Sequence, residues 1–351
     1  MANQLKRVKL GNKFLEVPII QGGMGVGISL GNLAGNVAKN QAMGTISAAQ
    51  IGFKEKDFIN NPLKANLRIL KKEIVKAKKI ANGKGLLACN VMVALNGYEE
   101  YVKEAVANKI DAIICGAGLA LDLPSLVNQE TLIAPIVSSK KALELLIRRW
   151  QKKFNREPDF VVIEGFEAGG HLGFKKKEVL ANSYQSLKEI LADCLAFLKE
   201  KQLTIPLFVA GGIYDHDDIC DYLALNAAGV QMGTRFVATN ECDAPLSFKE
   251  KYLKANNEDI VITRSPTGLV ARAIKSDYLN KLDQNEFNKV NHCYDCLKTC
   301  NPASTVYCIS EALIASASGK DGLFFSGSNA CRIKEIIPVK QLMNELRGIN
   351  R

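Results

Sequence analysis

The chain has 351 residues, of which 47% are hydrophobic and 23% charged, and its formal net charge is +10. These values are ordinary for a folded globular protein and exclude a disordered or fibrous one. No uncharged apolar run approaches the ~18 residues of a membrane span, and the positively charged start lacks the apolar segment of a signal peptide. We therefore expect a cytoplasmic protein without a membrane partner.

The excess of positive charge lies largely in lysine-rich stretches such as residues 67–85, where apolar residues recur at helical spacing. Solvated helix faces explain this pattern better than a nucleic-acid surface does. The sequence also contains no basic-aromatic RNA motif and no zinc-finger spacing. We expect no nucleic-acid partner.

Eight short apolar runs without polar alternation recur along the chain, a pattern typical of parallel strands that are buried on both faces. Amphipathic segments with helical spacing fill gaps between them. An open doubly wound sheet shows a similar alternation, but eight repeats within roughly 240 residues favour the α/β fold of a closed (β/α)8 TIM barrel. The runs are residues 17–23, 42–48, 86–93, 112–119, 132–139, 160–165, 206–212 and 229–236.

The alternation of strands and helices stops after Phe236. We predict that residues 1–240 form the barrel, and that residues 241–325 form an appended, largely helical and cysteine-bearing subdomain or lid on the substrate side. A strand-like run at residues 259–266 interrupts this region. Residues 326–351 are predicted to form a C-terminal packing segment.

Glycine-rich stretches follow the first, sixth, seventh and eighth runs, at residues 21–27, 164–173, 210–213 and 232–236. In a TIM barrel the loops after the strands carry the reactive groups, and the loops after strands seven and eight often bind phosphate. Glycine lets backbone N–H groups approach a ligand closely, although each glycine also suits a simple tight turn. The arrangement predicts a phosphorylated cofactor. Leu30 occupies the third glycine position of a dinucleotide fingerprint, which argues against a Rossmann domain.

His171 follows two glycines at the end of the sixth run. An imidazole titrates near neutrality, which suits proton transfer on a catalytic loop. Spacing alone leaves two roles open, a catalytic acid or base and a structural histidine that hydrogen-bonds to the backbone.

Five stretches in the same order resemble the family of nitronate monooxygenases and 2-nitropropane dioxygenase-like flavoproteins, whose relatives include flavin-dependent enoyl-acyl-carrier-protein reductases. The resemblance covers roughly residues 15–275 and rests on "PIIQGGMGVGIS", "NVM", "EGFEAGGHLGF", "VAGGI" and "GVQMGTRF". It implies a TIM barrel that binds FMN, and it matches His171 to a catalytic histidine beside the flavin. The residues that the resemblance assigns to FMN are Gly22, Gly23, Met24, Asn90, Glu164, Gly169, Gly170, Ala210, Gly211, Gly212, Gln231, Gly233 and Thr234.

The resemblance implies an FMN-dependent oxidoreductase that oxidises small alkyl nitronates with O2 to a carbonyl compound and nitrite. The alternative is an NAD(P)H-dependent FMN reductase of enoyl thioesters or quinones. Residues 270–276 resemble a corresponding stretch in the enoyl reductases. Arg235, Arg264 and Arg272 are candidate sources of positive charge for an anionic substrate, although ordinary surface or salt-bridge roles fit them as well. The sequence leaves the oligomeric state open, and a homodimer is compatible with it.

Four of the ten cysteines lie close together in the sequence, at Cys293, Cys296, Cys300 and Cys308. Thiolates at this density suit zinc or an iron–sulfur cluster, but the spacing matches no established metal motif. Reduced structural cysteines and redox-active thiols are the alternatives.

Overall fold

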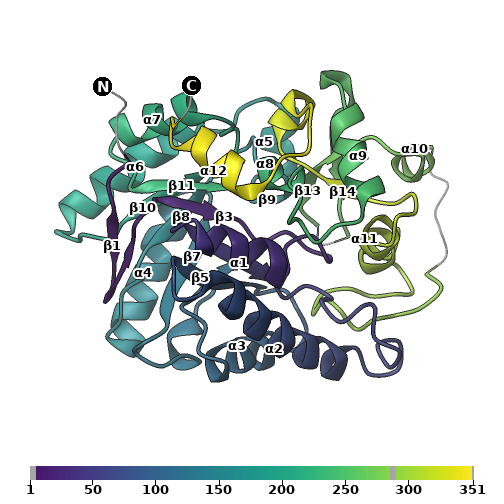
Figure 1. Cartoon of the computed structure of the whole chain (residues 1–351), viewed down its shortest axis with the longest axis horizontal. Coiled ribbons are helices and arrows are strands. Elements are labelled where there is room, and N and C mark those ends of the chain that lie inside the picture. Colours follow the sequence, from purple (N-terminus) through teal and green to yellow (C-terminus); the bar gives the residue numbers. More distant parts are fainter. Residues whose placement is uncertain (1–4, 267, 285–289, 350–351) are drawn as a thin grey trace.

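The computed structural model describes residues 5–266, 268–284 and 290–349. Eight parallel strands close into a barrel in the order β10-β11-β3-β4-β5-β6-β7-β8, with helices around it (Figure 1). These strands are β3 (Ile19–Gln21), β4 (Met43–Ser47), β5 (Leu86–Met92), β6 (Ala112–Gly116), β7 (Leu132–Val137), β8 (Val161–Glu164), β10 (Leu207–Ala210) and β11 (Gly229–Met232). The predicted TIM barrel is confirmed, and each strand lies within its predicted run.

The barrel interior is filled by apolar side chains such as Ile20 and Phe208. A hairpin that the sequence analysis did not predict, β1 (Val8–Leu10) and β2 (Lys13–Leu15), adds the fully buried Leu10 and Leu15 to this interior. The hairpin turn lies against Leu132, the first residue of β7. It therefore closes the amino end of the barrel and leaves the carboxyl end for a ligand.

Helices lie around the outside of the barrel, and the longer ones present an apolar stripe to the strands and a charged face to solvent. They are α1 (Gly31–Lys39), α2 (Pro62–Ala81), α3 (Tyr98–Ala107), α4 (Lys140–Phe154), α5 (Lys176–Leu180), α6 (Leu187–Glu200), α7 (His216–Ala224) and α8 (Thr234–Val237). The link after β6 departs from the expected alternation and contains the short 3-10 helix η1 (Leu123–Ser125). The buried Trp150 of α4 covers this link, where its indole Nε1 donates to the carbonyl of Ala120 at 2.9 Å.

The region after the barrel contains the expected helices and also a small antiparallel sheet, which lies beside α9 and α11 in Figure 1. Strand β13 pairs with β12, with β14 and with β9, which follows barrel strand β8. The prediction of a largely helical lid was incomplete, because β9 and β14 are too short to show a strand pattern. The elements are β9 (Gly170–Leu172), α9 (Leu246–Lys254), η2 (Asn257–Asp259), β12 (Ile260–Arg264), β13 (Val270–Ile274), α10 (Asp277–Asp283), α11 (Ile309–Ala317), β14 (Phe324–Phe325), η3 (Ser328–Arg332) and α12 (Val339–Leu346).

Helix α12 packs against α1 and α7 of the barrel. The carbonyl of Leu346 lies 2.9 Å from Nδ1 of the buried His216, and Arg235 pairs with Glu345 at 2.8 Å. These contacts tie the end of the chain to the outside of the barrel. Among the described residues, no helix combines the length and apolar character needed to cross a membrane.

Candidate functional site

A cavity of about 460 Å³ lies at the carboxyl ends of the barrel strands and is bounded on its far side by residues of the lid. Every residue that the sequence analysis assigned to catalysis or to FMN lines this cavity. They are Gly22, Gly23, Met24, Asn90, Glu164, Gly169, Gly170, His171, Ala210, Gly211, Gly212, Gln231, Gly233 and Thr234. The structure brings these residues together, and their individual roles remain predictions.

The loops after β10 and β11 present backbone donors to the cavity. Gly211 and Gly212 have φ values of +103° and +75°, which residues with a side chain rarely adopt. The N–H groups of Gly211, Gly212, Gly233 and Thr234 make no hydrogen bond to the described residues. Unpaired backbone donors at glycine loops are a common way to bind phosphate.

Two amide side chains line the cavity, that of Asn90 on β5 and that of Gln231 on β11. A Cβ atom at Gly23 would lie 2.3 Å from Cβ of Asn90, so Gly23 is what allows Asn90 to approach this loop. Oε1 of the buried Gln231 has no hydrogen-bond partner among the described residues. A buried acceptor without a partner is costly, so it indicates a ligand that donates to it. An edge with both donors and acceptors, such as that of a flavin ring, fits this pair of amides.

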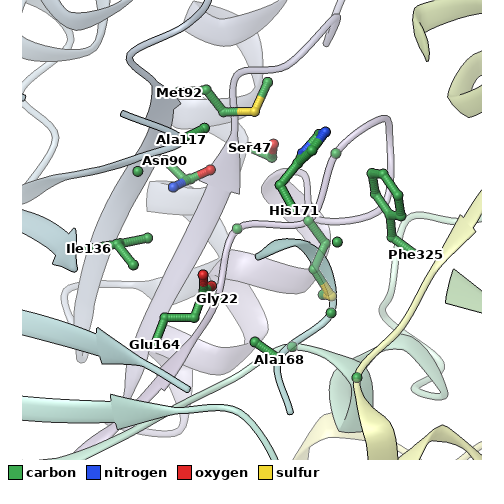
Figure 2. Close-up of a pocket in the computed structure, with 18 of the residues that line it drawn as sticks. Gly22, Ser47, Asn90, Met92, Ala117, Ile136, Glu164, Ala168, His171 and Phe325 are labelled. Carbon is green, nitrogen blue, oxygen red and sulfur yellow. The ribbon is translucent and has the colours of Figure 1, made fainter. Parts of the chain in front are cut away.

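Glu164 ends β8, and its carboxyl points into the same space as the Asn90 amide (Figure 2). Burial raises the pKa of Glu164 to about 8. The carboxyl is therefore protonated at neutral pH and can donate a hydrogen bond to a ligand.

His171 lies on β9, across the cavity from Asn90 (Figure 2). It pairs with Ala271 of β13, its Nε2 lies 2.7 Å from the hydroxyl oxygen of Ser265, and its ring meets that of Phe325 edge-on at 5.2 Å. Burial lowers the pKa of His171 to about 4, so the imidazole is neutral at neutral pH. The lid thus holds a neutral imidazole at the cavity, where it can accept a proton or form a hydrogen bond.

Arg272 holds the loop that leads to His171. Its guanidinium donates to the carbonyls of Phe166 and Ala168, the latter at 2.8 Å, and lies over the Phe166 ring at 4.5 Å. This buried arginine braces the backbone just before β9. Its role is therefore to position the loop.

None of the three candidate arginines lines the cavity, so the alternative of ordinary surface or salt-bridge roles fits them better than a source of charge for the substrate. The guanidinium of Arg272 donates to carbonyls of the loop before β9, Arg235 pairs with Glu345, and Arg264 is exposed. Among the described residues that line the cavity there is no lysine and no arginine. A ligand that enters meets neutral polar groups and carboxyl groups.

Several residues outside the predicted set complete the cavity. Ser326 and Gly327 lie beside the predicted phosphate loops, and the N–H of Gly327 donates to the hydroxyl of Thr234 at 2.8 Å. The stretch "FFSGSN" was the available signal, because a segment rich in serine and glycine follows two phenylalanines. Further lining residues are Ser47, Met92, Ile136, Ser138, Leu297, Leu313 and Phe325.

The cysteine segment does not form a metal site in the part of the chain that the structure describes, because no group of three His, Cys, Asp or Glu side chains could hold an ion. Cys293 is exposed, and Cys296, Cys300 and Cys308 are partly buried. Burial raises the pKa of Cys296, and it raises that of Cys308 to about 11. The zinc or iron–sulfur hypothesis is therefore not supported. Cys296 instead lines the cavity.

Comparisons with known proteins place this geometry in a family. A family model described as nitronate monooxygenase matches residues 7–348. A probable nitronate monooxygenase from Bacillus subtilis (strain 168) is 30% identical over 197 residues, which cover 54% of this chain and 51% of that protein. The matched segments span between 31% and 51% of the length of the first curated relatives.

Two solved structures share the fold. FabK from Thermotoga maritima has a TM-score of 0.72 and 26% identity, and the match covers 94% of this chain and 91% of that one. A nitroalkane oxidase from Streptomyces ansochromogenes has a TM-score of 0.71, with 94% of each chain covered. Its identity of 19% restricts this second likeness to the fold.

Proposed function

The chain belongs to the nitronate monooxygenase family, whose enzymes are flavin-dependent oxidoreductases. From this premise we propose that it binds FMN and oxidises alkyl nitronates with O2 to a carbonyl compound and nitrite. The observation that carries the proposal is the neutral imidazole of His171 in a cavity whose other walls carry unpaired backbone donors and an unpaired amide oxygen. Small-molecule substrate and O2 are the partners that this reaction requires.

The residues present fit FMN. The phosphate would be held by the N–H groups of Gly211, Gly212, Gly233 and Thr234. These residues follow the seventh and eighth barrel strands, where TIM barrels often bind phosphate. Asn90, Glu164 and Gln231 would bind the ring or the ribityl chain at the barrel mouth. When bound, FMN would supply the electron transfer, and the protein would supply orientation and charge.

His171 would act on the substrate. The hydrogen bond between Nε2 and the Ser265 hydroxyl and the edge-on contact with Phe325 fix the ring at the cavity wall. A neutral imidazole can take an acidic C–H proton from a nitroalkane, and next to a nitronate anion its protonated form is favoured by the opposite charge. The side chain would thus serve as base or as the group that stabilises the anion.

A second candidate is an NAD(P)H-dependent reductase of enoyl thioesters or quinones. The cavity supports it in one respect, because the described lining residues provide no cation for an anionic substrate. The likeness to FabK, at 26% identity, also bears on this alternative. The two candidates share FMN and differ in what reduces it.

The first experiment is to purify the protein, record its visible spectrum and replace His171 with asparagine. We expect a yellow protein with FMN bound, and a variant that keeps the flavin but turns over nitronate far more slowly. A colourless protein that takes up no flavin would overturn the proposal. Unchanged turnover in the variant would remove His171 from catalysis.

A further inference from the structure

One wall of the cavity is built by the lid helix α11, which follows the cysteine segment. Its residues Ile309, Leu313 and Ser316 line the cavity at spacings of four and three, and therefore lie on a single face of the helix. Leu313 is only partly buried although it faces the interior of the lid. An apolar side chain left uncovered at a cavity wall is available to a ligand.

The wall continues through Leu297 and Cys296 and is fixed to the barrel. Leu297 forms a β-bridge with Leu95 after β5, and the carbonyl of Cys296 accepts from the N–H of Asn96 at 3.1 Å. The N–H of Lys298 donates to the carbonyl of Ala94 at 3.0 Å. Backbone bonds on both sides of Leu297 make this wall a defined surface beside the barrel mouth.

The charges around the cavity restrict what lies against this wall. Glu164 and Glu167 are the acidic residues among the described lining residues, and no lysine or arginine accompanies them. Lys298 is nearby in sequence, but its ammonium donates to the carbonyl of Val93 at 3.0 Å and is not among the lining residues. A second negative charge on a substrate would find no cationic partner here, which is costly in a desolvated site.

We propose that the substrate has one polar reactive end, which lies at His171, and an uncharged apolar body of several carbons, which lies against Leu297, Ile309 and Leu313. This inference rests on the proposed function and specifies its substrate class: nitronates with an extended alkyl body and no second charged group. Leu313 is the residue that sets the preference for chain length, because it is the partly uncovered apolar residue of the α11 face.

The test measures kcat/KM of the FMN-bound enzyme for primary alkyl nitronates from two to eight carbons, and for a three-carbon nitronate that carries a carboxylate. Each methylene buried against the wall should raise kcat/KM by about fourfold until the wall is covered. The carboxylate-bearing nitronate should be among the poorest substrates. A flat series, or a preference for the carboxylate, would overturn the inference.

Two variants identify the wall. Leu313→Ala should flatten the dependence of kcat/KM on chain length. Ile314→Ala on the same helix is the matched control, because Ile314 is partly buried but does not line the cavity, and the dependence should survive there. Equal effects of the two substitutions would show that Leu313 is a structural residue only.

A binding measurement separates this inference from the proposed function. Unreactive primary alkyl amides of the same lengths are titrated into the FMN-bound protein, and the change in the flavin spectrum gives their dissociation constants. Tighter binding by about fourfold per methylene, lost in Leu313→Ala, supports the wall even if no nitronate is oxidised. Binding that is independent of length refutes the wall even if nitronates are oxidised.

Discussion

Replacing Ser265 with alanine removes the hydroxyl that lies 2.7 Å from Nε2 of His171. Burial keeps the pKa of His171 near 4, so the lost hydrogen bond joins two neutral groups and contributes about 0.5–1.5 kcal/mol. If this bond orients the imidazole toward substrate, kcat/KM for a nitronate should fall about two- to twelvefold. The flavin content should stay unchanged, because Ser265 does not line the cavity.

The assay compares Ser265→Ala with Ser265→Thr, which keeps the hydroxyl and should retain most of the activity. A double-mutant cycle with His171→Ala then locates the effect, because Ser265→Ala should cost clearly less once the imidazole is gone. Equal losses in the presence and absence of His171 would refute the idea that Ser265 acts through the histidine. An unchanged kcat/KM in the single variant would refute it as well.

Three further substitutions test the rest of the site. Gly23→Ala places a Cβ 2.3 Å from Cβ of Asn90 and should sharply lower the FMN content of the purified protein. Gly83→Ala strains the backbone at φ +75° but its Cβ would meet nothing within 4 Å, so this variant should keep its FMN. Because the pKa of Glu164 is about 8 in the folded protein, against 4.5 for an ordinary glutamate, the folded state holds an extra proton between these values. The melting temperature of the flavin-free protein should therefore fall more steeply between pH 5 and pH 9 than that of Glu164→Gln. Curves of melting temperature against pH that run parallel for the two proteins would contradict this. Arg272→Met leaves two loop carbonyls unpaired and should lower the unfolding free energy by about 1–3 kcal/mol in urea, so an unchanged midpoint would contradict its bracing role.

The barrel was predictable because its signals are local. Each strand is a mostly apolar run without polar alternation, and glycines follow several of them at the carboxyl ends, where barrel geometry brings distant loops together. Gly211 and Gly212 could be placed at one cavity with His171 for this reason. No contact between side chains had to be known.

The lid was not predictable in the same way, because its structure depends on pairings between distant segments. Strand β9 is three residues long, and its pairing of His171 with Ala271 joins positions that no local pattern connects. Arg272 was a candidate source of positive charge for an anionic substrate, but its guanidinium donates to the loop carbonyls of Phe166 and Ala168. The cysteine spacing suggested a metal site, which the described residues do not form. Leu313, which follows the cysteines in the sequence, lines the cavity instead.

The most direct test of the central claim is anaerobic reduction of the FMN-bound protein. It is mixed with an alkyl nitronate, and separately with NADH and NADPH, while the visible absorbance of the flavin is followed. The proposed function predicts rapid loss of the flavin absorbance with the nitronate. Bleaching by NADH or NADPH and not by the nitronate would contradict it and would favour the reductase.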